Sequence, residues 1–75
     1  MDITKDIVDK YTTEQIVAYL DHLVGGVSQN YRTALKTGRP EFLWGSLGDI
    51  VQTRDILHEM RTRNDARAAI AKEAS

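Results

Sequence analysis

The pattern of apolar and polar positions follows the helical period through most of this chain. In its first half, apolar side chains recur at steps of three and four residues, which places them on one face of a helix. These positions are Ile16, Leu20, Leu23, Val24, Val27, Tyr31, Ala34 and Leu35. The phase is kept across Gly25-Gly26, although two glycines inside a helix cost about 2 kcal/mol relative to alanine. The pattern therefore predicts one helix within residues 12–37.

Both ends of this helix carry capping signals. Thr12 is a suitable N-cap, and Gln15 stands at the third helical position, where it completes a capping box. Tyr11 and Ile16 occupy the two positions of a hydrophobic staple. Gly38 follows the last apolar position and suits the left-handed conformation that ends many helices.

A second helix is predicted over residues 40–63. Pro40 suits a first helical position, and the alternative start is Ser46, which begins a possible capping box. The apolar stripe consists of Phe42, Leu43, Trp44, Leu47, Ile50, Val51, Leu57 and Met60. The alanine-rich residues 64–75 either extend this helix or fray.

Residues 1–11 are predicted to form a short helix with Thr4 as its cap. No alternating strand pattern is present, so the expected fold class is all-α.

The four residues 37–40 are short enough to join the two long helices as an antiparallel hairpin. Folding the sequence about Gly38 brings Tyr31 near Gly45 and Val27 near 48–49. The same fold brings Gly25-Gly26 near 50–51. Bulky side chains would then meet glycines, as in closely packed helices.

Apolar residues outnumber the positions of one seam between two helices. Val17, Val24 and Leu35 flank the first stripe, and Trp44, Val51 and Ile56 flank the second. This surplus favours a dimer in which two hairpins form a four-helix bundle.

The composition supports a single domain, residues 1–75, that associates with itself. The chain has 75 residues, 41% hydrophobic and 28% charged, and no cysteine. A domain of this size has a thin core, and a disulfide is excluded as a staple. With two histidines, no metal or cofactor is expected. The net charge of −1 gives no general attraction to nucleic acid or an anionic membrane.

The expected location is the cytoplasm. No apolar run approaches the roughly 18 residues that span a bilayer. The acidic residues 1–6 also lack the pattern of a secretory signal. A soluble protein without membrane contact is therefore predicted.

Catalysis finds little support in the residues. No glycine-rich phosphate loop is present, since 45–48 lacks a lysine and a preceding strand. His22 falls on a polar side of its helix. The sequence therefore predicts a protein that is not an enzyme.

The main candidate binding surface contains Arg54, His58 and Arg61. Their spacing places them on one face of the second helix, where arginines can hold a carboxylate or phosphate in two hydrogen bonds. Ion pairing with nearby acids is the favoured interpretation, and a small anionic or nucleotide ligand is the alternative. Arg54 also follows the spacing of Leu47, Ile50 and Leu57, as expected for a core seam. A buried guanidinium would need a carboxylate or a ligand.

Trp44 is the other candidate for partner binding. Lying beside Phe42 and Leu43, it could be a binding hot spot. An anchor in the core or in a dimer interface is the favoured interpretation, since tryptophan contributes a large apolar area.

Residues 26–36, read GVSQNYRTALK, resemble the turn and recognition helix of helix-turn-helix repressors, and 13–18 resemble the first helix of that motif. The resemblance covers about a third of the chain and implies DNA binding through Ser28, Gln29, Asn30 and Arg32, with Arg39 on phosphate. Gly25-Gly26 come later than the turn glycine of that motif, and the charge is near neutral.

Taken together, the residues favour a small, non-enzymatic protein-binding module that acts as a homo-oligomer. An adaptor, an inhibitor or an assembly factor acting on another protein fits this description. A DNA-binding regulator and a bundle that sequesters an anion are the alternatives.

Overall fold

The computed structural model describes residues 2–74, which form helices joined by short connections. In chain order these are α1 (Ile3–Lys10), α2 (Thr13–Thr37), the 3-10 helix η1 (Pro40–Ser46) and α3 (Leu47–Ala74). No strand occurs among the described residues. The predicted all-α class is therefore confirmed.

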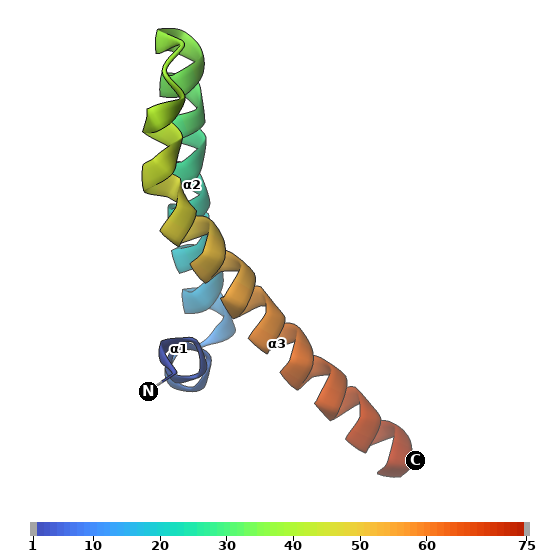
Figure 1. Cartoon of the computed structure of the whole chain (residues 1–75). Coiled ribbons are helices and arrows are strands. Elements are labelled where there is room, and N and C mark those ends of the chain that lie inside the picture. The colour runs from blue at the N-terminus through green and yellow to red at the C-terminus, as the bar shows by residue number, and fades with distance from the viewer. Residues whose placement is uncertain (1, 75) are drawn as a thin grey trace.

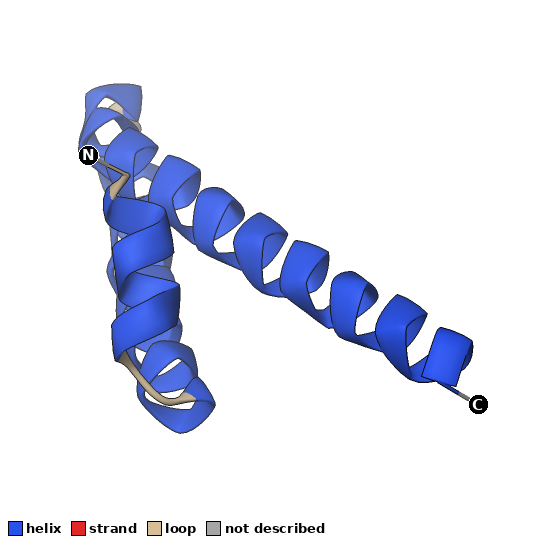
Figure 2. Cartoon of the chain, turned by 90° about the horizontal axis from the view of Figure 1, so that it is seen from below, coloured by secondary structure: helices blue, strands red, loops and turns tan. Residues whose placement is uncertain are grey.

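The helices give an elongated molecule (Figure 1). From Gly38 the chain turns back, and η1 and the first turns of α3 run along α2 in the opposite direction. The rest of α3 then diverges from α2, and its C-terminal end projects from the molecule (Figure 2). The radius of gyration is 16.3 Å, whereas a compact chain of this length would have about 11 Å. The extents are 57 × 24 × 20 Å.

The ends of α2 are those predicted. The Thr12 hydroxyl accepts the Gln15 backbone N–H at 3.2 Å, and the Gln15 side chain accepts the Thr12 N–H at 3.0 Å. Gly38 has a φ of 69°, and its N–H donates to the Ala34 carbonyl. Helix α2 continues without interruption through Gly25-Gly26.

The cap of α1 differs from the expectation. Thr4 lies inside the helix, and Asp2 is the N-cap. The Asp2 carboxylate accepts the backbone N–H groups of Thr4 and Lys5 at 3.0 and 3.3 Å. Aspartate is favoured here because its negative charge also meets the positive end of the helix dipole.

The prediction that an α-helix starts at Pro40 is wrong, because residues 40–46 form the tighter 3-10 helix. The Phe42 N–H donates to the carbonyl three residues earlier, on Arg39. The end of η1 is held against α2, because the Asn30 amide donates to the buried Ser46 hydroxyl at 2.7 Å. The α-helix begins only after this contact, at Leu47, one residue beyond the alternative start at Ser46.

The core lies where α1, α2 and α3 meet. Ile56 is fully buried, and Ile7, Val8 and Met60 pack against the cluster that it forms with α2. The buried hydrophobic members are Ile16, Leu20, Leu23 and Ile56. Ile56, expected only to flank the second stripe, is thus the centre of the core.

The expected packing of bulky side chains against glycines is wrong. Gly25 and Gly48 have open space where a side chain would project. Gly26 and Gly45 face polar groups, the Asp49 carboxylate at 4.0 Å and the Asn30 amide at 3.8 Å. Where α2 meets η1 and the start of α3, the neighbours of these glycines are therefore polar side chains or open space, not bulky apolar side chains.

Candidate protein-binding surface

An exposed apolar stripe runs the length of α2, beside the buried one. Its members lie about a quarter of a turn from the line of Ile16, Leu20 and Leu23, given 100° per residue. They are Val17, Val24, Tyr31 and Leu35. The first three recur every seven residues, and Leu35 is 84% exposed. Such a seven-residue repeat is typical of a helix that packs along a second helix.

A second exposed stripe runs along α3 and corrects the predicted core seam. It consists of Leu47, Ile50, Arg54, Leu57 and Arg61. All five are exposed, because α3 turns Ile56 toward the core and this stripe away from it. The Arg54 side chain is 71% exposed and pairs with Asp55 at 3.0 Å. The expectation that burial obliges Arg54 to bind a carboxylate or a ligand is therefore wrong.

The two stripes lie on the same side of the helix pair. Around each helix axis, the exposed stripe is rotated by about a quarter to a half turn from the buried residues of the same helix. On both helices this rotation has the sense in which the chain winds from its N-terminus to its C-terminus. For right-handed helices that run in opposite directions, this rotation leads to the same side. We call this side the uncovered face, formed by the α2 stripe and by Ile50, Arg54, Leu57 and Arg61 of α3. Leu47 is left out because it borders a hollow that Ile3 and Thr4 of α1 also line.

The opposite side of the pair is closed by α1 and by polar contacts. The Tyr19 hydroxyl donates to the Gln52 amide oxygen at 3.0 Å, across α2 and α3. Arg63 on α3 donates to Asp9 of α1 and to Glu59 at 3.0 Å. The hydrogen bond to Asp9, followed by that to Glu59, raises the pKa of Arg63 above its usual value. The hydrogen bond between Arg63 and Asp9 thus joins α1 to α3, and that between Tyr19 and Gln52 joins α2 to α3.

The predicted binding residues Arg54, His58 and Arg61 do share one side of α3, and all three are exposed. Arg54 pairs with the adjacent Asp55, and Arg61 lies 4.0 Å from Asp65 one turn later. Both acids belong to α3 itself, and an interfacial role of the three residues stays a prediction.

Trp44 lies on the surface of η1 with 62% of its area exposed, so it is not a core anchor. Its neighbour Phe42 lies under the Arg39 guanidinium, 5.7 Å from the ring centre. A role for Trp44 in a dimer interface or in partner binding stays a prediction.

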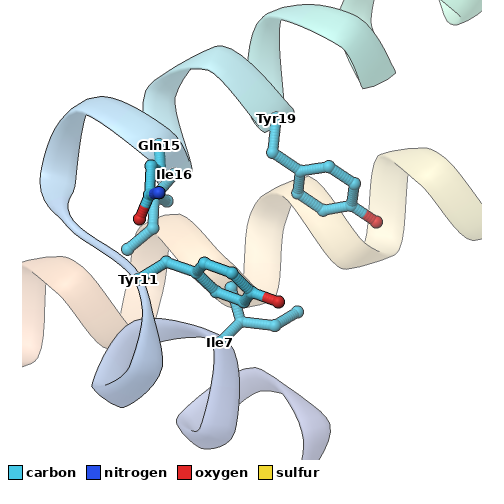
Figure 3. A pocket seen from close by; sticks show the side chains of 5 residues that line it. All are labelled: Ile7, Tyr11, Gln15, Ile16 and Tyr19. Atoms are coloured by element: carbon cyan, nitrogen blue, oxygen red, sulfur yellow. The ribbon is translucent and has the colours of Figure 1, made fainter.

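Surface hollows surround the junction of the helices. The one in Figure 3 is lined by Ile7, Tyr11, Gln15, Ile16 and Tyr19, with the Tyr11 ring beside Ile7. Its lining is mostly apolar, and the polar groups of Gln15 and Tyr19 already have partners. Another hollow has Val8, Ile16 and Met60 in its wall and is bordered by Arg61, Arg63, Asn64 and Arg67, among others.

Within residues 2–74 the two histidines lie on the surface. His22 is exposed, as predicted, and His58 is exposed too. Within this range no three histidine, aspartate or glutamate side chains gather to hold a metal ion. Nor does any helix there have the length and apolar content to cross a membrane.

Sequence reasoning missed the two polar contacts that fix the fold, Asn30 with Ser46 and Arg63 with Asp9. The partners are far apart in sequence, and each is an ordinary helix-surface residue in its own segment. Only Glu59 with Arg63, four residues apart on one helix, gave a visible signal.

Comparison with known proteins gives no functional information. The chain matches no family model, no curated protein and no solved structure. The resemblance to helix-turn-helix repressors also lacks its central feature, because Gly25–Ser28 are helical and no turn separates 13–18 from 28–36.

Proposed function

We propose that this chain is a small, non-enzymatic protein-binding module that acts as a homodimer. In this proposal α2, η1 and α3 form the antiparallel hairpin, and two hairpins pack through their uncovered faces into a four-helix bundle. The observation that carries it is the imbalance between buried and exposed apolar side chains. Among the described residues, four hydrophobic side chains are buried, whereas fourteen large ones are exposed.

The physical support is the thin core. A chain of this length depends on burying a large share of its apolar surface, and the elongated shape prevents it from doing so alone. Exposed patches that are apolar and continuous mark interaction sites. The chain has no cysteine that could replace this contact with a disulfide.

A further protein partner is part of the proposal. The C-terminal end of α3 projects away from the other helices, with Ile70 exposed near it. A dimer with two such arms can act as an adaptor, an inhibitor or an assembly factor. We place this activity in the cytoplasm.

Sedimentation over a concentration series tests the dimer. We expect a dimer at micromolar concentration and a monomer after Val24→Ser with Ile50→Ser, since both changes remove apolar contacts from the uncovered face. Ile70→Ser, on the projecting arm, is the matched control and should leave the dimer intact. A wild-type chain that stays monomeric at these concentrations refutes the proposal.

A further inference from the structure

Two acidic residues border the uncovered face on α2, and two basic residues border it on α3. On α2, Glu14 and Asp21 are seven residues apart, at the outer edge of the Val17 and Val24 stripe. On α3, Arg54 and Arg61 are also seven residues apart, at the outer edge of the Ile50 and Leu57 positions. Each pair spans about 10 Å along its helix, at 1.5 Å per residue. The spacing of the acids thus matches that of the arginines.

The two acids form no ion pair in the part of the chain that the structure describes. Within residues 2–74 neither Glu14 nor Asp21 forms an ion pair, and both are exposed. The two arginines pair only with acids of their own helix, Asp55 and Asp65. All four groups are therefore open to a second molecule.

The contacts within one copy set which residues lie at the same height on α2 and α3. Gly26 faces Asp49, and Asn30 bonds to Ser46 near the connection. Asp21 precedes Gly26 by five residues on α2, and Arg54 follows Asp49 by five residues on α3. In the same way, Glu14 precedes Gly26 by twelve residues, and Arg61 follows Asp49 by twelve. Each acid thus has the height of one arginine.

A two-fold axis can use this correspondence. If the axis runs between two copies along the bisector of α2 and α3, rotation places α2 of each copy antiparallel along α3 of the other. Residues at equal height within one copy then also oppose each other between copies. Each interface is isologous and closed, so the assembly stops at two chains.

We propose that the uncovered face binds a second copy of this chain in this arrangement, with Glu14 opposite the partner's Arg61 and Asp21 opposite the partner's Arg54. The proposal rests on the homodimer proposed above and specifies its geometry. The Val17 and Val24 stripe packs along the partner's α3 stripe, and the ion pairs border it. Such border pairs contribute little energy each, and their main effect is to select one alignment.

The alternative two-fold arrangement is disfavoured by charge. An axis across the helices would pack α2 on the partner's α2 and α3 on the partner's α3. Glu14 and Asp21 would then lie along the same acids of the partner's α2. Arg54 and Arg61 would lie along the same arginines of the partner's α3. Like charges brought together in this way oppose association.

Cross-linking tests the alignment of the helices. Because the chain has no native cysteine, a maleimide reagent reacts only with the introduced thiols. Asp21→Cys and Arg54→Cys are prepared separately and treated with a short bis-maleimide. We expect cross-linked dimers when the two variants are mixed and none from either variant alone. Cross-linking of Asp21→Cys with itself would show α2 against α2 and would overturn the proposal.

Charge reversal gives a second, independent measurement. E14K with D21K, and R54E with R61E, should each weaken the homodimer about tenfold or more, with α-helix content checked by circular dichroism. Mixing the two double variants should restore a dimer of near wild-type affinity, because every pair is again opposite in sign. Failure of the mixture to associate better than either component contradicts the proposed pairs.

The two levels of the proposal fail differently. A wild-type monomer in sedimentation refutes the homodimer and, with it, this geometry. A wild-type dimer that shows no cross-link between Asp21→Cys and Arg54→Cys leaves the homodimer standing and refutes only the arrangement of its helices.

Discussion

The two sides of the α2 and α3 pair are built from similar residues but differ in what covers them. On one side, α1 packs Ile7 and Val8 against the core, and Arg63 bonds to Asp9. On the other side, Val17 and Val24 of α2 and Leu57 of α3 remain exposed. The difference lies in the position of one eight-residue helix.

This comparison explains why the apolar surplus of the sequence is not resolved within one chain. A pair of packed helices has two sides, and a single short helix can close only one of them. The side without a helix keeps its apolar stripes and two acids that form no ion pair among the described residues. It is therefore the side on which we propose self-association.

The largest effect is expected at the core beneath α1. Ile56→Ala removes the most buried side chain, and such changes reduce the free energy of unfolding by about 2–5 kcal/mol. Urea denaturation followed by circular dichroism measures the change. Ile70→Ala, on the exposed arm, is the control and should have little effect. Equal effects at the two positions would contradict the assignment of the core.

Arg63→Met tests what holds α1 on the covered side. The change keeps an apolar side chain but removes the hydrogen bonds to Asp9 and Glu59. We expect faster hydrogen exchange for the amides of α1, while those of Leu20 and Leu23 in α2 stay protected. In the matched control, Arg67→Met, exchange of α1 should not change. Unaltered protection of α1 after Arg63→Met would show that apolar packing alone holds it.

Gly25 lies on neither packed surface, with open space around its Cα. Gly25→Ala should raise the free energy of unfolding by about 1 kcal/mol, because alanine is the better helix former. Gly38→Ala is the opposite case, since the φ of 69° strains any side chain and costs about 1 kcal/mol or more. Denaturation curves of the two variants should shift in opposite directions. A loss of stability in Gly25→Ala would indicate a close neighbour at this position.

The smallest effect is expected at the connection, where neither side is involved. A backbone hydrogen bond, and then the Arg39 side chain, lowers the pKa of Glu41 below its usual value. A carboxylate with a lowered pKa in the fold stabilises it above the unfolded pKa, and this contribution is lost as the pH falls through the folded pKa. Glu41→Gln should therefore reduce stability slightly at neutral pH and not in acid. Unfolding followed by Trp44 fluorescence checks this, and a difference that persists at low pH would contradict it.

Local structure followed from local residues. The capping box of Thr12 and Gln15, the end of α2 at Gly38 and the helical phase across Gly25-Gly26 were all predicted. Each depends on groups within a few residues of each other, so the sequence contains the whole interaction. The predicted start of an α-helix at Pro40 and the predicted Thr4 cap of α1 were wrong, because several nearby residues could serve.

The candidate surface was predicted in part. The sequence placed Arg54, His58 and Arg61 on one side of a helix, as the helical period requires. It also assigned that side to the core, and the structure places it outside. Helix α3 carries two apolar stripes with helical spacing, and the spacing does not determine which of them packs against the neighbouring helix.

The sequence by itself therefore determined the all-α class, both ends of α2 and the residues that share each helix face. The tertiary structure decided which faces are buried. That choice depends on the direction in which η1 leaves Gly38, on Asn30 meeting Ser46, and on α1 folding back through Asp9 onto Arg63. These contacts join residues remote in the chain, and their energies depend on relative helix orientation, which no local pattern specifies.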